Sequence, residues 1–344
     1  MIVTVVSIIL VFFLLIFPHE LGHFLLAKIW NIRVDKFSLG MGPKLFSFKR
    51  GETEYLISWL PIGGYVKIAG MQPGEENVER GFQKQSLGRR ILVLLAGSFA
   101  NYLVAIILFT LIFMVGFWTF QVDIPIIGEV KDGSPAALAN LTPGDKILKI
   151  NGKKIGKWED IAMTIEENKE EETLTLEIQR EKEIFTVTLT PAFDPDLNKK
   201  VIGITPLKVF KRCNPLVALI EGAKESFMIT GLIFISIGGM ITGKVPLEFA
   251  GPVGIVQFVR ESAHLGVISL LSLAAFLSIN LALFNLFPIP VLDGGRLFLL
   301  LLEKIRGKAL GLEKEAIINY IGFIIIIFLF FLVTYQDILR IMGG

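Results

Sequence analysis

The sequence predicts a multi-pass α-helical membrane protein with about four transmembrane helices, a membrane-associated β-hairpin or sheet, and one inserted α+β domain. Hydrophobic residues make up 53% of the 344 positions and charged residues 19%, whereas soluble domains average about 45–50% and about 25%. The excess lies in several long apolar runs, as bilayer-spanning helices require. A polar stretch in mid-chain contains segments in which apolar and polar residues alternate, which is typical of half-buried strands.

The first apolar run, residues 2–17, continues through Pro18 as far as Trp30. A cleaved signal peptide is the alternative to a membrane-spanning helix. Signal peptides begin with basic residues and end in a small-residue cleavage site, and neither feature flanks this run. We therefore expect one helix that the mature protein retains.

The polar, glycine-rich segment that follows contains two short apolar stretches. Residues 55–60 and 65–68 are predicted to be short strands that flank a turn at 61–64, because the turn holds a proline and two glycines. Residues 70–85 are expected to form a loop. The next long apolar run, about residues 91–117, is the second expected span.

A soluble domain is expected from about residue 121 to residue 208. Residues 174–178 and 185–189 alternate apolar and polar side chains and predict two half-buried strands. In residues 158–167 the apolar side chains recur at helical spacing, which predicts one amphipathic helix.

The apolar segment 215–243 is interrupted by charged residues, among them Glu221, Lys224 and Glu225. It predicts either an interfacial amphipathic helix or a distorted span, and we favour the interfacial helix.

A third span is expected over about 267–287, where Pro288 and Pro290 break the helix, and a fourth over about 317–333. The expected domains are residues 1–120 with the first two spans and the β region, 121–208 as the inserted domain, 209–266 as an amphipathic or interfacial linker, and 267–344 with the last two spans.

Basic residues are concentrated between the first two spans: Lys28, Arg33, Lys36, Lys44, Lys49, Arg50, Lys67, Lys84, Arg89 and Arg90. Such an excess is typical of cytoplasmic segments. Four spans then place both termini and the inserted domain outside. The net charge of +2 gives no electrostatic case for nucleic-acid binding.

His19, Glu20 and His23 form the pattern H-E-x-x-H within the first span. Residues four apart share one face of a helix, so both imidazoles can reach one metal ion. Glu20 lies beside that face, within reach of a water that a zinc ion makes acidic. The pattern therefore predicts a zinc site with Glu20 as the catalytic acid and base.

The alternative is a pair of histidines that serve only helix packing. Ionisable groups are costly at membrane depth, by about 2.5–3.5 kcal/mol for an aspartate, lysine or arginine. A packing role would not need a glutamate beside the two imidazoles, so the sequence favours the metal site.

A catalytic zinc needs a third protein ligand and an open coordination position. Asp293 is the best candidate, because it follows the two prolines of the third span and precedes two glycines. Irregular backbone at that depth is tolerated where it is buried in protein or lines a watery cavity. The alternative role is a helix N-cap. Asn285 is either a hydrogen-bond donor to substrate or a turn residue.

Two motifs of this chain, H-E-x-x-H at residues 19–23 and the segment 288–295 that contains Asp293, resemble those of the site-2 protease family of intramembrane metalloproteases. They occur in the same order and in apolar surroundings. Within this family the chain is most similar to the bacterial regulator-of-sigma-E protease group, which includes RseP and RasP. The resemblance implies zinc bound by His19, His23 and Asp293, catalysis by Glu20, and cleavage of peptide bonds within transmembrane segments. It also implies that Asn285 handles substrate.

The hairpin around Gly63 and Gly64 resembles the membrane-associated sheet of that family, whose exposed edge could pair with an unwound substrate. An ordinary surface hairpin is the alternative. Residues 134–152 resemble a bacterial PDZ domain, which binds peptide ends beside a helix. The stretch 96–101 resembles a family motif with proline after the glycine; Ser98 stands there instead, so a role for Asn101 stays open.

This resemblance implies a multi-pass protein of the bacterial inner (cytoplasmic) membrane, with the PDZ-like domain on the outer face and the active site toward the cytoplasm. The expected partners are the lipid bilayer, single-span membrane substrates such as anti-sigma factors or signal peptide remnants, a peptide or protein ligand of the PDZ-like domain, and no nucleic acid.

Two other functions are considered. A membrane scaffold with a dead metal site would use the PDZ-like domain, but Glu20 is intact. A zinc transporter would need several polar residues in different spans to form a path, and the apolar spans offer too few.

Overall fold

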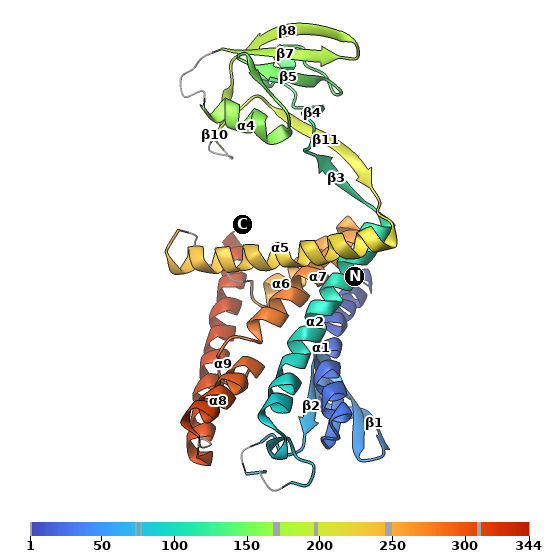
Figure 1. Ribbon diagram of the computed structural model, residues 1–344, viewed down its shortest axis with the longest axis vertical. Helices are drawn as coiled ribbons and strands as arrows, with labels where there is room; N and C mark the ends of the chain where they lie inside the picture. The colour runs from blue at the N-terminus through green and yellow to red at the C-terminus, as the bar shows by residue number, and fades with distance from the viewer. Residues whose placement is uncertain are drawn as a thin grey trace. The chain divides into compact units, whose positions relative to one another are not determined.

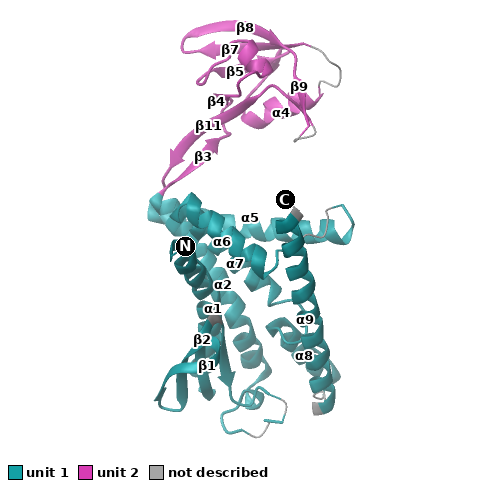
Figure 2. Cartoon of the chain, turned by 180° about the vertical axis from the view of Figure 1, so that it is seen from behind, with its two compact units in different colours: residues 1–115, 213–344 teal, residues 116–212 magenta. Residues whose placement is uncertain are grey.

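The computed structural model describes residues 2–72, 74–75, 78–167, 173–195, 199–244, 250–307 and 311–343. The chain forms two compact units (Figures 1 and 2). The first combines residues 1–115 with residues 213–344, and the second consists of residues 116–212.

Five helices in the described part of the first unit are long and apolar enough to cross a membrane. They are α1 (Ile2–Ile29), α2 (Leu87–Val115), α5 (Pro215–Ile241), α7 (Val267–Phe284) and α9 (Leu312–Gly343). Four of them match the expected spans, and the fifth, α5, is the segment whose placement the sequence left open. The chain is thus a multi-pass membrane protein.

Helix α5 differs from the other four in its direction. Figure 1 shows it running across the ends of the more upright helices, as an interfacial helix would. Its first half packs on α2, where a Cβ at Gly222 would lie 2.8 Å from the hydroxyl of Thr110. Farther along, the hydroxyls of Tyr102 and Thr230 lie 3.1 Å apart.

Two shorter helices complete the bundle, α6 (Pro252–Leu265) and α8 (Asp293–Arg306). Between α7 and α8 the two prolines stop the helix, and the chain reverses tightly, so that the Gly294 N–H donates to the Asn285 carbonyl at 2.7 Å. A Cβ at Gly294 would lie 2.3 Å from the Leu286 carbonyl oxygen. The turn therefore requires glycine, and it delivers Asp293 to the start of α8.

The β region holds more strand than the sequence predicted. Strand β1 (Val34–Arg50), which the sequence pattern did not predict, pairs antiparallel with β2 (Thr53–Ile68). The expected turn at 61–64 also lies within β2. Glycines and a proline interrupt the alternation of β1, and the positive φ of 87° at Gly40 lets the strand bend there.

Strand β1 lies between two parts of β2. Phe37 pairs with Tyr55 on one side and with Val66 on the other. The segment 64–68 is therefore an edge of this sheet among the described pairings. Large apolar side chains are exposed toward the hairpin end: Leu45, Phe46, Phe48, Trp59 and Leu60. A patch of this kind suits contact with lipid and agrees with a membrane-associated sheet.

The second unit is a small α+β domain. Its larger sheets have the strand orders β6-β5-β7-β8 and β3-β11-β4. The elements are β3 (Phe117–Gln121), β4 (Ile127–Val130), α3 (Pro135–Leu138), β5 (Lys146–Ile150), β6 (Lys153–Lys154), α4 (Trp158–Glu167), β7 (Leu174–Arg180), β8 (Glu183–Leu189), β9 (Ala192–Asp194), β10 (Lys199–Val201) and β11 (Ile204–Lys211). The predicted helix at 158–167 and the two predicted strands, now β7 and β8, are confirmed.

The core of this unit is built from aliphatic side chains such as Ile147, Leu176 and Ile178, all fully buried. Beside it Asp145 is also fully buried, and it accepts two hydrogen bonds from the Arg180 guanidinium, each at 2.8 Å. Burial alone would raise the pKa of Asp145, but the hydrogen bonds from Arg180 and Thr142, together with the positive charge of Arg180, outweigh burial and hold that pKa below its ordinary value.

Candidate metal centre

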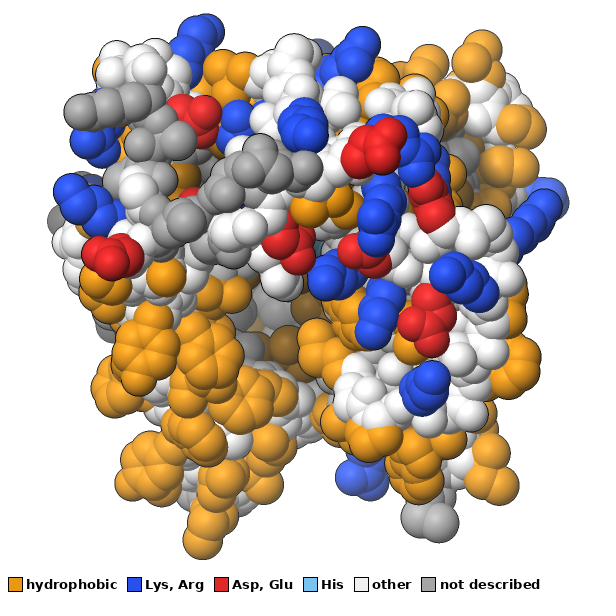
Figure 3. Space-filling model, turned by 90° about the horizontal axis from the view of Figure 1, so that it is seen from below, with side chains coloured by type: hydrophobic (Ala, Val, Ile, Leu, Met, Phe, Trp, Pro, Cys, Tyr) orange, Lys and Arg blue, Asp and Glu red, His pale blue; other side chains and the backbone are white. Residues whose placement is uncertain are grey.

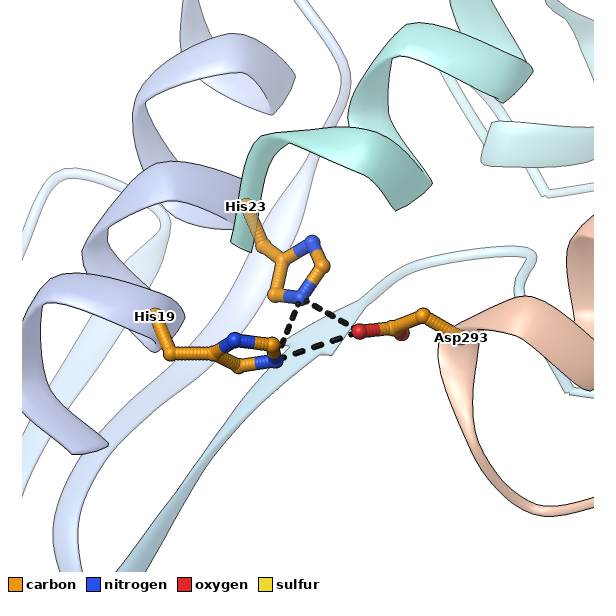
Figure 4. Close-up of side chains that lie close together, drawn as sticks. All are labelled: His19, His23 and Asp293. Carbon is orange, nitrogen blue, oxygen red and sulfur yellow. Dashed lines mark hydrogen bonds and ion pairs between the residues drawn. The ribbon is translucent and has the colours of Figure 1, made fainter. Parts of the chain in front are cut away.

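Helix α1 brings His19 and His23 onto one face, one turn apart. Their Nε2 atoms lie 3.2 Å from each other, and both residues are buried. The helical spacing that the sequence predicted therefore produces a pair of imidazole nitrogens aimed at one point, as Figure 4 shows.

Asp293 completes the cluster from the other end of the chain. Its Oδ2 lies 3.1 Å from Nε2 of His19 and 3.1 Å from Nε2 of His23 (Figure 4). As the first residue of α8 it does not cap the helix with its side chain, so the alternative role of N-cap is wrong. Two imidazoles and one carboxylate form a set of three protein donors that suits a catalytic zinc.

The second nitrogen of His23 has a partner of its own. Nδ1 donates to the carbonyl oxygen of Val93, on α2, at 2.7 Å. This bond fixes the tautomer that leaves the Nε2 lone pair free to face the cluster, as is usual for metal-ligating histidines. The role of Val93 could not be predicted from the sequence, because every residue has a backbone carbonyl and the residue type does not show which carbonyl accepts a hydrogen bond.

Gly97 provides the space that the imidazoles occupy. A Cβ at this position would lie 2.4 Å from Nε2 of His23 and 2.7 Å from Cε1 of His19. Any larger residue would collide with the ligands. In the sequence, Gly97 stands out only as part of the stretch 96–101 that resembles a family motif. A glycine in the interior of an apolar span is the signal that could have identified it.

A pocket of about 470 Å³ contains the cluster. The pocket is lined by every site residue that the sequence predicted: His19, Glu20, His23, Gly63, Gly64, Asn285 and Asp293. The structure therefore brings residues of α1, β2, the α7 end and the α8 start to one place.

Within this pocket the two remaining polar candidates lie close to the ligands. Nδ2 of Asn285 is 3.5 Å from Nε2 of His19, and the backbone of Val66 hydrogen-bonds the Glu20 carboxylate. The edge segment 64–68 and the end of α7 thus border the cluster on different sides. By contrast, His264 is exposed on α6 and is not part of the cluster.

Asn101 lies one turn beyond Gly97 on α2 and is fully buried. Neither atom of its amide has a hydrogen-bond partner among the described residues, and the same holds for the hydroxyl of Ser98. A buried amide is costly when it is unpaired. This observation supports a functional role for Asn101, which the sequence left open.

An ion pair ties the far end of α8 to α2. Arg90 is buried, and its guanidinium donates to both carboxylate oxygens of Glu303 at 3.1 and 3.3 Å. Because Asp293 begins α8 and Glu303 lies near its end, the helix that carries Asp293 is held at both ends. Sequence reasoning did not find this pair, because its members are separated by 213 positions.

Comparisons with known proteins agree with this geometry. The model of peptidase family M50 matches residues 7–329. The regulator of sigma-W protease RasP of Bacillus subtilis is 32% identical over 419 aligned residues, which cover 98% of this chain and 99% of the relative. The zinc metalloprotease RasP of Bacillus licheniformis is 34% identical over 98% of this chain and 99% of its own.

Among solved structures, the crystal structure of the PDZ domain of the SdrC-like protein from Listeria monocytogenes is 25% identical, covers 26% of this chain and 92% of its own, and gives a TM-score of 0.22. The family match extends over most of the chain, and both relatives exceed 30% identity over nearly full length. The chain therefore belongs to peptidase family M50 and is a zinc metalloprotease of the site-2 protease type.

Proposed function

We propose that this zinc metalloprotease hydrolyses peptide bonds within the membrane-spanning segments of other proteins. One observation carries the proposal. His19 and His23, whose Nε2 atoms meet Asp293 at 3.1 Å, belong to an apolar helix long enough to cross the membrane. A hydrolytic site within a membrane-spanning helix is suited to a peptide bond that also lies within the membrane.

Each site residue receives one role in the proposal. His19, His23 and Asp293 hold the zinc ion, which, when bound, polarises a carbonyl and supplies reactive water at neutral pH. Glu20 accepts the proton of the attacking water and passes it to the departing amine. The Val93 carbonyl orients His23 through Nδ1.

The edge segment 64–68 is proposed to bind the unwound substrate backbone by strand addition. Gly63 and Gly64 line the metal pocket. A Cβ at Gly64 would lie 3.3 Å from Cγ of Glu20, so glycine there lets this part of β2 lie close to the catalytic carboxylate. Asn285, beside His19, is proposed to hydrogen-bond a substrate carbonyl. An extended substrate is required because a protease must reach the peptide bond, which a helix shields.

The proposed location is the bacterial cytoplasmic membrane, with the active site toward the cytoplasm and the PDZ-like domain outside. Figure 3 shows Lys and Arg side chains, mixed with acidic ones, gathered at one end of the first unit, while apolar side chains cover its flanks. Basic segments favour the cytoplasmic side.

In this proposal residues 1–120 and 267–344 carry the chemistry, 121–208 bind a peptide or protein ligand, and 209–266 form the linker. The substrates are single-span proteins, either anti-sigma factors or signal peptide remnants. The name of the Bacillus subtilis relative, a regulator of sigma-W protease, supports the first of these classes.

The test is cleavage of a model single-span substrate by purified protein in detergent or vesicles. Glu20→Gln should abolish cleavage while zinc stays bound at one ion per chain. Glu159→Gln, on the exposed face of α4, is the matched control and should cleave normally. Full activity of Glu20→Gln would end the assignment, and protein that carries no stoichiometric zinc would favour a scaffold instead.

A further inference from the structure

An apolar groove lies between α1, α5 and α7, beside the metal pocket. It encloses about 750 Å³. Its walls include Phe12, Leu15, Ile233, Ile237, Leu277 and Phe284. Neither the motifs nor the proposed chemistry uses this groove.

The groove adjoins the metal pocket. Ile16 of α1 and Leu281 of α7 line both spaces. Ile16 is one helical turn before Glu20, and Leu281 is one turn before Asn285. The groove therefore lies within one helical turn of Glu20 along α1 and of Asn285 along α7.

The chemistry of the walls restricts the occupant. Polar side chains contribute little to the lining, and one of them, Asn280, already donates to the carbonyl of Phe276 at 2.8 Å. Phe276 is 42% exposed and Leu232 is 53% exposed, so the groove is open along one side. It offers dispersion contacts to apolar groups and no charge to a polar ligand.

The length of the groove fits a stretch of polypeptide. Its α7 wall extends from Phe276 to Phe284, about 12 Å at 1.5 Å per residue. That distance accommodates roughly two turns of helix or about four extended residues. A lipid chain could also enter, but it would have no reason to reach a site where a peptide bond is cut.

We propose that the groove binds the apolar part of the substrate that is still helical or partly unwound in the membrane, next to the bond being cut. This inference rests on the proposed intramembrane cleavage and adds a second binding surface to it. The edge segment 64–68 holds the extended residues at the cluster, while α1, α5 and α7 hold the apolar residues that adjoin them. The groove thereby makes the enzyme prefer aliphatic and aromatic residues on that side of the bond.

The test fills the groove from α5. Ile233→Trp places a large side chain in the groove, and Ile235→Trp is the matched control, because Ile235 lies two residues away on the same helix, is 72% exposed and does not line the groove. Each variant is assayed on a single-span substrate and on a short soluble peptide.

Ile233→Trp should reduce kcat/KM for the membrane substrate at least tenfold more than for the short peptide, whereas Ile235→Trp should leave both unchanged. An equal loss on both substrates, or no loss on either, would overturn the groove proposal. Zinc content and elution as a monodisperse species show that each variant has folded.

A photo-crosslinking residue at position 237 in the Glu20→Gln background gives an independent measurement. It should form a covalent adduct with the membrane substrate, and adducts with lipid alone would overturn the proposal. The two proposals fail separately. If the unmodified enzyme does not cut within a membrane segment, the proposed function fails; if it cuts and Ile233→Trp cuts equally well, the groove proposal alone fails.

Discussion

Helices α2 and α9 have nearly the same length, 29 and 32 residues, and both are rich in apolar residues. Eleven residues of α2 are buried, whereas the buried positions among the described residues of α9 are Gly322 and Asp337. A long apolar run therefore predicts that a helix crosses the membrane, but not whether its side chains meet protein or lipid. In this molecule the more buried helix, α2, shapes the candidate metal site, whereas the more exposed helix, α9, lies at the edge of the bundle.

Among the variants that compare α2 with α9, the largest effect is expected from Gly97→Ala in α2. The new Cβ would lie 2.4 Å from the Nε2 of His23, so the imidazoles must move. Their Nε2 atoms would then no longer lie close to the carboxylate of Asp293. Cleavage should fall by at least about 100-fold, since a misplacement of about 1 Å can cost that much, and zinc content should fall with it.

Gly88→Ala is the control for this variant. Gly88 lies on the same helix, and a Cβ added there would meet no heavy atom of another described residue within 4 Å, beyond its chain neighbours and the adjoining helix backbone. Alanine there should retain full activity and stabilise the helix by up to about 1 kcal/mol. Normal zinc content in Gly97→Ala would show that α2 does not shape the site.

A second pair of variants compares the apolar side chains of the two helices directly. Leu94 of α2 is 1% exposed and Ile324 of α9 is 48% exposed. Leu94→Ala should lower the free energy of unfolding by about 2–5 kcal/mol, because it leaves a cavity, and Ile324→Ala by less than about 0.5 kcal/mol. Unfolding in mixed micelles measures both, and equal losses would remove the contrast between the helices.

Asp337 is the exception within α9, because it is buried and has protein partners. Its carboxylate accepts from the backbone N–H groups of Gly254 at 2.8 Å and Gly251 at 3.2 Å, at the start of α6. Asp337→Ala should destabilise α6 by about 0.5–2 kcal/mol, the usual loss for a helix cap.

Hydrogen exchange of the α6 amides measures this effect. Asp337→Asn keeps one acceptor oxygen and should give a smaller increase in exchange than Asp337→Ala. Unchanged protection in both variants would mean that α9 is not attached to α6 through this side chain.

The smallest effect is expected in the second unit, where a buried aspartate is paired with arginine rather than with helix amides. The pKa of Asp145 is lowered, so its contribution to stability is present above the unfolded pKa of about 3.9. It is lost as the pH falls through the lower folded pKa. The protection factors of the β5 and β7 amides against hydrogen exchange should therefore fall below about pH 4, and Arg180→Gln should lower these protection factors at neutral pH as well.

The spans and the three residues of the candidate metal cluster could be predicted from the sequence because each has a local signal. His19 and His23 are four residues apart on one helix, and Asp293 stands between helix-breaking prolines and glycines. Asn285, Gly63 and Gly64 were predicted through the family resemblance and also line the pocket. The roles of all these residues in binding zinc or substrate remain predictions.

What the sequence did not show depends on distant or backbone partners. The Val93 carbonyl, the space at Gly97 and the pair Arg90–Glu303 are defined by how α2 packs, which no spacing along the chain reveals. Strand β1 was not predicted for another reason. Its glycines and lysines interrupt the alternation of apolar and polar side chains, and several of its residues each pair with two parts of β2.

The chain enters the second unit along β3 and leaves it along β11, and these strands pair at their outer ends, Phe117 opposite Lys211. The points where the chain enters and leaves the second unit are therefore adjacent, so the insert is connected to the first unit at one place. Residues added within such an insert need not change the spacing between α2 and α5, which the pairing of β3 with β11 fixes. The alignment with the Bacillus subtilis relative, which needs 419 positions for a chain of 344 residues, shows that length varies while the family persists.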